Sequence, residues 1–216
     1  MKILVLDVGG TNVKIIATGH RIPIKISSGP EMNARKMVEA VKKAVADWDY
    51  DVVSIGYPGP VVRGRPFAEP YNLAPGWVRF NFRKALGRPV KIINDAAMQA
   101  LGSYEGGRML FLGLGTGLGS AMISHGEIEP MELAHLPYKN GRTYEDYLGL
   151  AGLKRLGKKK WRHHVGDVVT RFQKALQAEY VVLGGGNARF LKKLPPDTHQ
   201  GDNLNAFRGG YRLWKK

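Results

Sequence analysis

The sequence predicts an α/β fold built from two similar lobes, residues 1–107 and 108–216. Stretches rich in β-branched residues alternate with stretches of helical periodicity, which is typical of α/β architecture. The segments 3–17 (ILVLDVGGTNVKIIA) and 109–123 (MLFLGLGTGLGSAMI) share one design, a strand, a Gly-rich turn and a second strand. They start about half of the 216-residue chain apart, so each is expected to open one lobe, with the two turns facing each other.

The remaining elements continue this alternation, with a short hinge expected near 103–108. Apolar residues at helical spacing predict helices, and short apolar runs bounded by Gly or Pro predict strands. In the first lobe we expect, in order, the hairpin 3–17, a helix over 31–48, a strand at 52–55, a loop over 56–77, a strand at 90–93 and a helix of small residues over 96–104. In the second lobe we expect the hairpin 109–123, an irregular loop at 132–138, helices over 143–156 and 164–178, a strand at 180–183 and a short helix over 204–213 that packs back on the first lobe.

The composition excludes several classes of protein. Hydrophobic residues make up 44% and charged residues 24% of the chain, which argues against disorder. Without cysteine the chain has no disulfide, thiol nucleophile, iron–sulfur cluster or Cys-ligated zinc. No signal-like run precedes the first strand, which begins at Lys2, and no stretch approaches about 18 uncharged apolar residues. We therefore expect a soluble, cytoplasmic protein with no membrane partner.

The chain carries 33 Lys and Arg against 18 Asp and Glu, a formal charge of +15, which predicts a polyanionic partner. Nucleic acid, an anionic lipid surface and a phosphate-rich substrate all satisfy that charge. The densest basic run, 154–162, is interpreted either as a solvated face or as a polyanion track through Lys158, Lys159 and Lys160. The chain lacks the aromatic and basic interleaving of an RRM and the spacing of a zinc finger, so no nucleic-acid partner is expected.

The two Gly-rich turns are suited to binding phosphate. Backbone N–H groups converge on a phosphate oxygen only where no Cβ blocks the approach, and a Thr hydroxyl adds a donor. Either turn alone favours a purely structural hairpin, but two at half-chain offset favour phosphate binding. The motif GLGTGLG is not a dinucleotide fingerprint, because neither frame completes GxGxxG and a strand follows it.

Two acidic residues stand at the ends of hydrophobic strands. Asp7 precedes the first turn, where a carboxylate either caps the turn or holds a hydrated Mg²⁺ on donor phosphates. Asp95 is expected to cap the helix that follows it, and a carboxylate there is also placed to accept a hydroxyl proton in phosphoryl transfer. Glu132 and His135 lie three residues apart, a spacing that suits neighbouring sugar hydroxyls or, with further ligands, a metal.

Seven motifs occur in a fixed order along the chain. They are DVGGT at 7–11, GYPGPV at 56–61, NLAPGW at 72–77, IINDA at 92–96, LGTGLGSA at 114–121, ELAHLP at 132–137 and VVLGGG at 181–186. The set resembles the ROK family of sugar kinases, especially the branch that phosphorylates glucose from polyphosphate. The resemblance spans nearly the whole chain and implies a two-lobed actin-like ATPase (ribonuclease H-like) fold with a cleft between the lobes.

The resemblance also assigns roles to residues. It implies a hexose kinase acting on the 6-hydroxyl of glucose, with Asp95 as general base, Asp7 as a ligand of Mg²⁺ through water, and polyphosphate or ATP as phosphoryl donor. The implied sugar contacts are Asn72, Asn94, Asp95, Glu132 and His135. The implied phosphate or nucleotide contacts are Asp7, Gly9, Gly10, Thr11, Gly115, Thr116, Gly117, Gly184, Gly185 and Gly186.

The chain departs from the family pattern in two places. Many members carry a Cys-rich zinc motif after the Glu/His loop, and here TYEDYLGLAGLKRLGKKKW stands instead, so no structural zinc is expected. Ala134 replaces the usual Gly, which leaves open an ATP-dependent kinase for another sugar. A non-catalytic sugar-sensing regulator is the other alternative, although such regulators carry an N-terminal helix-turn-helix and strand one here begins at residue 2. A homodimer is compatible with the sequence.

Overall fold

The computed structural model describes residues 1–202 and 204–215, and the chain divides into two compact units. Unit 1 comprises residues 1–98 together with the chain from Ala206 onward, and unit 2 comprises residues 99–205. The last helix therefore belongs with unit 1. The segment before residue 108, which the sequence placed in the first lobe, belongs from residue 99 onward with unit 2.

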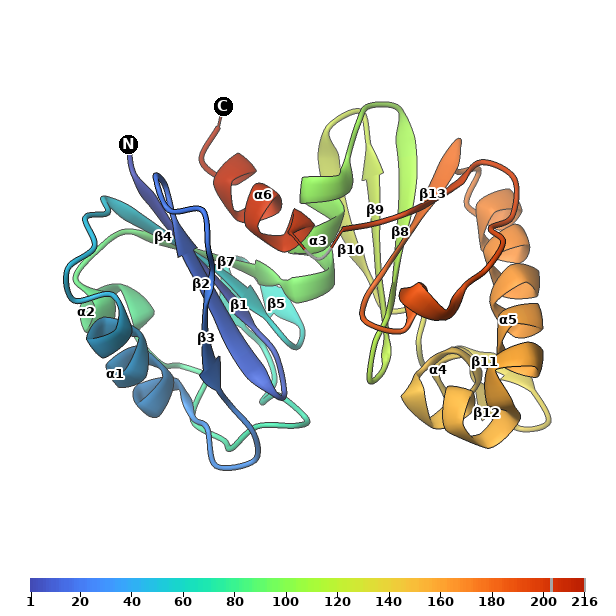
Figure 1. Cartoon of the computed structure of the whole chain (residues 1–216), viewed down its shortest axis with the longest axis horizontal. Coiled ribbons are helices and arrows are strands. Elements are labelled where there is room, and N and C mark those ends of the chain that lie inside the picture. The colour runs from blue at the N-terminus through green and yellow to red at the C-terminus, as the bar shows by residue number, and fades with distance from the viewer. Residues whose placement is uncertain (203, 216) are drawn as a thin grey trace. The chain divides into compact units, whose positions relative to one another are not determined.

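Unit 1 is built on a five-stranded sheet with the order β3-β2-β1-β4-β7 (Figure 1). β3, β2 and β1 pair antiparallel, and β4 and β7 continue the sheet parallel to β1. Its elements are β1 (Ile3–Val8), β2 (Asn12–Ala17), β3 (Ile24–Ser27), α1 (Ala34–Ala44), β4 (Val52–Tyr57), β5 (Val61–Val62), β6 (Arg65–Pro66), α2 (Phe82–Leu86), β7 (Val90–Asn94), the start of α3 (Asp95–Ser103) and most of α6 (Asn205–Arg212).

The core of unit 1 forms because its central strands are nearly all apolar. Every residue of β1 and β4 is buried. α1 begins after Asn33, whose side chain accepts the Lys36 N–H at 2.9 Å, and the helix buries Met37 and Val41 against the sheet. This cap explains why α1 begins at Ala34 rather than at residue 31, and the helix also ends earlier than the predicted 48, at Ala44.

Unit 2 repeats the same topology, with a sheet of order β10-β9-β8-β13-β14 (Figure 1). Again three strands pair antiparallel and two continue parallel to the first strand of the hairpin. The shared strand order confirms the predicted α/β class. The elements are β8 (Arg108–Leu114), β9 (Leu118–Ser124), β10 (Glu127–Met131), β11 (Pro137–Lys139), β12 (Arg142–Thr143), α4 (Tyr144–Leu148), α5 (Leu150–Ala175), β13 (Tyr180–Gly184), η1 (Ala188–Phe190) and β14 (Thr198–Gln200).

α5 consists of two helices that meet at a kink. The sequence predicted a break between helices at 143–156 and 164–178, and the break is present at Gly157, whose backbone is non-helical (φ 72°, ψ 159°), but the second helix starts directly after it rather than at 164. Trp161 and Val165 are buried in the unit 2 core, so the apolar periodicity continues across the basic run. The run 154–162 is therefore mostly helical, and its cations lie on more than one side of the helix.

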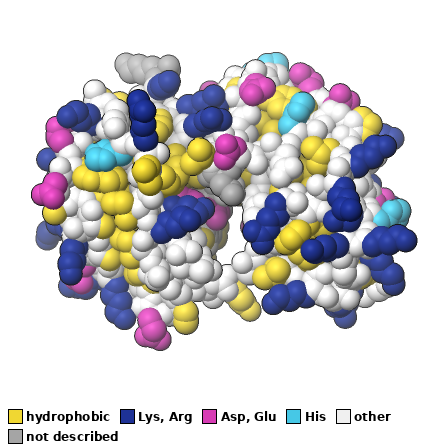
Figure 2. All heavy atoms as spheres, in the orientation of Figure 1, with side chains coloured by type: hydrophobic (Ala, Val, Ile, Leu, Met, Phe, Trp, Pro, Cys, Tyr) yellow, Lys and Arg dark blue, Asp and Glu magenta, His cyan; other side chains and the backbone are white. Residues whose placement is uncertain are grey.

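The surface is basic over both units. Lys and Arg side chains are spread across the visible face in Figure 2 rather than confined to one end of the chain. Among the described residues no helix has the length and apolarity needed to cross a membrane.

Candidate active site

The first Gly-rich turn joins β1 to β2, and its residues have different tasks. The Gly9 N–H donates to the Asn12 carbonyl at 3.0 Å, and the Ser28 hydroxyl donates to the Gly9 carbonyl at 2.6 Å. Gly9 therefore closes the hairpin itself. Gly10 and Thr11 follow at the exposed tip, where their backbone and the Thr hydroxyl can meet a phosphate.

Asp7 forms an ion pair across this hairpin. It lies in β1 directly opposite Lys14 of β2, and the Lys14 Nζ is 3.1 Å from the Asp7 Oδ2. The Asp7 side chain is 10% exposed and that of Lys14 is 35% exposed, so the lysine is the half of the pair that reaches solvent. Lys14 is absent from the predicted site, although counting the hairpin register back from the turn would have placed it opposite Asp7.

Asp95 is the most perturbed acid of unit 1. Burial and, next, the negative charge of Asp7 raise the pKa of its carboxyl to about 7, while backbone hydrogen bonds and the charge of Lys14 oppose the shift. The residue as a whole is half-buried, and one carboxylate oxygen accepts the Ala96 N–H at 2.8 Å. A carboxyl tuned to neutral pH beside a charged pair is the kind of group that transfers a proton.

Asn94, rather than Asp95, caps α3, so the predicted capping role of Asp95 is wrong. The Asn94 Oδ1 accepts the Ala97 N–H at 3.1 Å, three residues into the helix, while its Nδ2 donates to the Gly59 carbonyl at 3.1 Å. Asn94 thus ties the loop after β4 to the start of α3. This arrangement leaves Asp95 free of the capping bond.

The loop that carries Asn72 is held by an acid that the sequence did not single out. The Glu69 carboxylate accepts the three consecutive backbone N–H groups of residues 76–78 at 2.9 to 3.2 Å. Trp77 is fully buried and belongs to the core of unit 1. Asn72 is exposed and packs on the first turn, because a Cβ on Gly10 would lie 3.1 Å from that of Asn72.

The second Gly-rich turn, between β8 and β9, is braced by α4 and α5. The Leu118 N–H donates to Glu145 Oε2 at 3.0 Å, and a Cβ on Gly117 would overlap that carboxylate. The Thr116 carbonyl accepts the Leu150 N–H at 3.1 Å. Glu145, another residue missing from the predicted site, therefore fixes the shape of this turn.

The third glycine loop, Gly184–Gly186, lies against the second turn within unit 2. Gly185 has φ 81°, and a Cβ there would overlap the backbone of Leu114. The Asn187 Nδ2 donates to the Gly115 carbonyl at 2.8 Å. Two of the three predicted phosphate loops are thus joined by a direct hydrogen bond.

Glu132 and His135 face each other on the loop after β10. Their Oε1 and Nε2 atoms are 3.9 Å apart, and the side chains are 68% and 71% exposed, as expected for groups available to a ligand. Between them Ala134 is buried, and its carbonyl accepts the Glu145 N–H at 3.0 Å. The methyl group that replaces the family's usual glycine hydrogen therefore packs into the core and not toward the exposed pair.

A polar cluster anchors the hairpin that follows this loop. The Tyr138 hydroxyl donates to Asp167 Oδ2 at 2.6 Å, and Arg171 Nε donates to Asp167 Oδ1 at 2.9 Å. These hydrogen bonds, that from Tyr138 first, lower the pKa of the Asp167 carboxyl. The cluster holds β11 on α5 in the segment where many ROK kinases carry their Cys-rich motif.

The three lysines of the predicted track lie at the kink of α5 and are all exposed. The Lys158 Nζ is 4.7 Å from the centre of the Phe190 ring, in η1 just after the third glycine loop. Lys159 and Lys160 follow at steps of about 100° around the helix, so they do not lie on the side of the helix that faces Phe190.

The residues at the first turn fit a hydrated Mg²⁺. Most of its ligands would be water and the donor phosphates, and the protein would supply few. Asp7 supplies one carboxylate beneath the first turn, and Mg²⁺ needs few protein ligands because it keeps several waters. Within the described part of the chain, no three His, Asp or Glu side chains gather closely enough to form a metal site by themselves.

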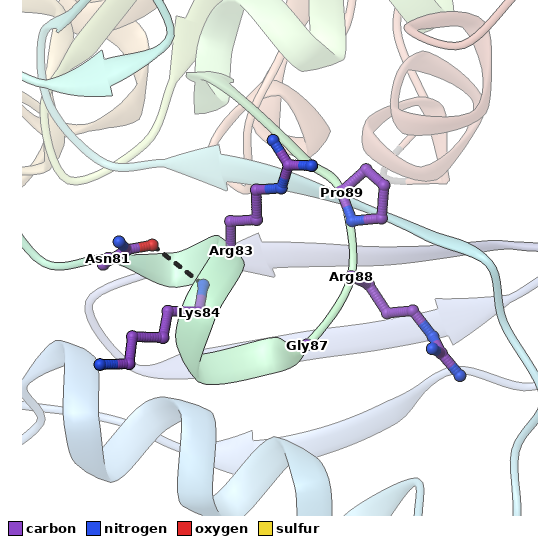
Figure 3. A pocket seen from close by; sticks show the side chains of 6 residues that line it. All are labelled: Asn81, Arg83, Lys84, Gly87, Arg88 and Pro89. Carbon is purple, nitrogen blue, oxygen red and sulfur yellow. Dashed lines mark hydrogen bonds between the residues drawn. The ribbon is translucent and has the colours of Figure 1, made fainter.

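A cavity of about 410 Å³ lies elsewhere in unit 1, beside α2. Arg83, Lys84 and Arg88 line it, but their side chains point in different directions (Figure 3). Because no polar groups converge there, this cavity provides no candidate site.

Comparison with known proteins gives likenesses in sequence and in fold, although no protein-family model matches the chain. Polyphosphate glucokinase of Mycobacterium tuberculosis is 28% identical over 219 aligned residues, covering 88% of this chain and 80% of the relative. The crystal structure of inorganic polyphosphate/ATP-glucomannokinase from Arthrobacter sp. strain KM has a TM-score of 0.83 at 22% identity, covering 97% of this chain and 96% of that one. A ROK family glucokinase from Streptomyces griseus, in complex with glucose and AMPPNP, has a TM-score of 0.76 at 17% identity over 99% of both chains.

These likenesses confirm the predicted resemblance to ROK sugar kinases and to polyphosphate glucokinase in particular. The fold prediction is confirmed as well, because the structural neighbours are ROK kinases with the two-lobed actin-like ATPase fold.

Proposed function

We propose that this chain, with its resemblance to the ROK sugar kinases, transfers a phosphoryl group from polyphosphate or ATP to the 6-hydroxyl of glucose. The observation that carries the proposal is the charge cluster of unit 1. Asp95, with its pKa near 7, stands beside the Asp7 and Lys14 pair under the first Gly-rich turn. A base, a cation and a phosphate-binding turn in one place are what phosphoryl transfer to a hydroxyl requires.

Asp95 acts as the general base. The sugar hydroxyl gives its proton to the Asp95 carboxylate as its oxygen bonds to the terminal phosphorus of the donor. The bridging P–O bond breaks, and its electron pair stays on the shortened polyphosphate or on ADP. A base with a pKa near the working pH is best matched to this task, because enough of it is ionised while it still binds the proton firmly.

The donor is held by backbone groups and cations. Gly10, Thr11 and Thr116 present N–H and hydroxyl donors at the two turns, and Lys14 reaches solvent beside Asp7. Bound Mg²⁺, held by Asp7 through water, would neutralise charge on the donor phosphates. Catalysis then consists mainly of positioning and electrostatic stabilisation.

The sugar contacts are assigned to polar groups on braced loops, of which only Asn94 is partly buried. Asn72 and Asn94 belong to unit 1, and Glu132 and His135 to unit 2. Glu69 fixes the loop that carries Asn72 by accepting backbone N–H groups, and Glu145 holds the loop of Glu132 and His135 by donating its own N–H to the Ala134 carbonyl, so both serve as positioning residues. A site of this kind selects its sugar through hydroxyl hydrogen bonds, because a missing hydroxyl leaves a polar group unpaired.

Polyphosphate is the favoured donor. The chain carries a charge of +15, and long polyphosphate offers many negative charges to such a surface. The sequence relative is a polyphosphate glucokinase, and the glucomannokinase is described as using both polyphosphate and ATP. ATP remains the alternative donor, and a sugar-sensing regulator is the alternative without catalysis. The tuned pKa of Asp95 favours an enzyme, since sugar binding alone needs no proton acceptor.

The test is a phosphorylation assay on a hexose panel with polyphosphate, ATP and GTP as separate donors. We expect glucose 6-phosphate as the main product, highest turnover with polyphosphate, and loss of turnover in Asp95→Asn. Sugar binding by calorimetry without turnover on any donor would favour the regulator. Turnover with ATP but not polyphosphate would reject the donor assignment and keep the kinase.

A further inference from the structure

We propose that long polyphosphate binds unit 2 on a cationic surface centred on Phe190 and formed by Lys158, Arg162 and Arg189, here called the Phe190 surface. The proposal rests on the proposed kinase function and assigns the place where the donor chain continues beyond the glycine loops. It replaces the predicted track through Lys158, Lys159 and Lys160.

Three cations from two elements converge on one residue. Lys158 Nζ and Arg189 Cζ lie 4.7 and 4.8 Å from the centre of the Phe190 ring. Arg162 Nε donates to the Phe190 carbonyl at 2.6 Å. The Phe190 ring packs on the unit 2 core and so holds these long side chains in place. Because the side chains are already ordered, a ligand loses less binding free energy to their conformational entropy.

The charges of this surface are not neutralised by the protein. In residues 1–202 and 204–215, Lys158, Arg162 and Arg189 form no ion pair with a carboxylate. Farther along α5 the cation Arg171 pairs with Asp167 at 2.9 Å. An unpaired group of cations attracts a polyanion more strongly than the same number of paired ones.

The Phe190 surface is continuous with the donor loops. η1 begins right after Asn187, whose side chain bonds to the Gly115 carbonyl of the second turn. The Phe190 N–H donates back to the Asn187 carbonyl at 3.0 Å. A long polyphosphate whose end is held at the glycine loops would therefore continue along unit 2 to the Phe190 surface. A triphosphate is expected to end before it reaches that surface.

Helix geometry separates Lys158 from its two neighbours. Arg162 lies four residues after Lys158 and so on the same side of the helix, facing Phe190. Lys160 lies four residues before His164, which contacts Tyr138 on another side. The three adjacent lysines thus cannot form one track.

The test compares two double variants of equal charge change, Lys158→Met with Arg189→Met, and Lys159→Met with Lys160→Met as the matched control. Met keeps most of the apolar stem, and Arg162 is left intact because its Phe190 bond is structural. At low salt the first double variant is expected to raise KM for long polyphosphate by roughly fivefold and to weaken its salt dependence. KM for tripolyphosphate, ATP and glucose should change by less than about twofold, and the control should change each KM by less than about twofold.

An equal rise for ATP and long polyphosphate, or an equal effect of the two double variants, would overturn the Phe190 surface. Calorimetric titration with long polyphosphate keeps the proposal separate from the kinase. If the wild type phosphorylates no sugar, a Kd raised in the first double variant alone still supports the surface, and an unchanged Kd rejects it. Titration with a single-stranded oligonucleotide tests nucleic acid as the ligand instead. If the first double variant binds the oligonucleotide more weakly but polyphosphate equally well, the Phe190 surface is rejected as a polyphosphate site.

Discussion

The two Gly-rich hairpins share a topology and differ in chemistry at matching positions. In the first, the cross-strand pair two residues before the turn glycine Gly9 is Asp7 with Lys14. In the second, the pair at the same distance before Gly115 is Gly113 with Gly119. The first turn also spans four residues between its last paired positions and the second spans three.

This difference indicates a division of labour. The first hairpin places a cation and a carboxylate beside Asp95, where charge would develop in the proposed transfer. The second hairpin carries no charge at its glycine pair and is braced by Glu145 and Asn187. On the proposed function, the repeat therefore supplies two turns for the donor phosphates, and the residues beneath them assign the chemistry to unit 1.

The largest expected effect comes from removing the base. Asp95→Asn should lower kcat by about 100-fold or more, because an amide keeps the shape but cannot take the proton. The fold should survive, since Asn94 provides the cap of α3. Steady-state kinetics with circular dichroism would check this, and retention of more than roughly a tenth of wild-type kcat would reject the general base.

The same variant has a signature in stability. The folded state holds the Asp95 proton up to about pH 7, whereas an unfolded carboxyl releases it near 3.8, so ionised Asp95 opposes folding above neutral pH. The Tm of Asp95→Asn at pH 8 is expected to equal or exceed that of the wild type. The difference in Tm between Asp95→Asn and the wild type should become smaller as pH falls from 7 toward 4.

The next effect tests the charged pair of the first hairpin. Lys14→Met should lower kcat by roughly tenfold or more, because the cation beside the donor and Asp7 is lost. Lys14→Arg should recover part of the activity, since it keeps the charge. A rise in donor KM with unchanged kcat would show that Lys14 binds the donor without favouring the transition state.

The pH profile connects the pair to the base. Asp95 must be ionised to act, so kcat/KM should fall below about pH 7, by about tenfold per pH unit on the acid limb. Lys14 lowers the pKa of Asp95, and its removal should therefore move this limb to higher pH. Profiles of the wild type and Lys14→Met, taken in buffers of equal ionic strength, would reveal the shift. Two identical profiles would contradict it.

A smaller effect is expected at the exposed pair of unit 2. Glu132→Gln and His135→Ala should each raise the glucose Kd by about five- to tenfold, the equivalent of one hydrogen bond. Calorimetric titration with glucose measures this directly. If neither variant changes the Kd, the pair has a structural role only.

The smallest effect concerns the second hairpin itself. The Ser120 hydroxyl donates to the Met131 carbonyl at 2.9 Å and accepts the Leu133 N–H at 3.2 Å, which holds the start of the Glu132 loop. Ser120→Ala should destabilise the fold by about 1 kcal/mol and leave kcat unchanged. Urea unfolding and kinetics on the same sample would check it. A loss of kcat comparable to that of Lys14→Met would contradict the division between the hairpins.

Much of the fold and part of the site could be read from local pattern. Each hairpin is a short-range object, so apolar alternation and glycine spacing predict it, and the repetition at half-chain offset predicts the shared sheet order. Asp95 was identified because it directly follows a strand in a motif. The break predicted in α5 is present at Gly157, but the second helix starts directly after it rather than at 164, because cations hid the apolar position Trp161, whose burial depends on the rest of unit 2.

Chain order alone accounts for the α/β class, the two glycine hairpins, the resemblance to ROK kinases and the position of Asp95 directly after a strand. These features depend on residues that are neighbours in sequence. The pairing of Lys14 with Asp7, the choice of Asn94 over Asp95 as the cap and the meeting of Lys158 with Phe190 depend on register, rotamer and packing. Each of these contacts contributes a net free energy of only about 1 kcal/mol, and alternative partners nearby would contribute a similar amount. The packing of the tertiary structure therefore decides which contact forms.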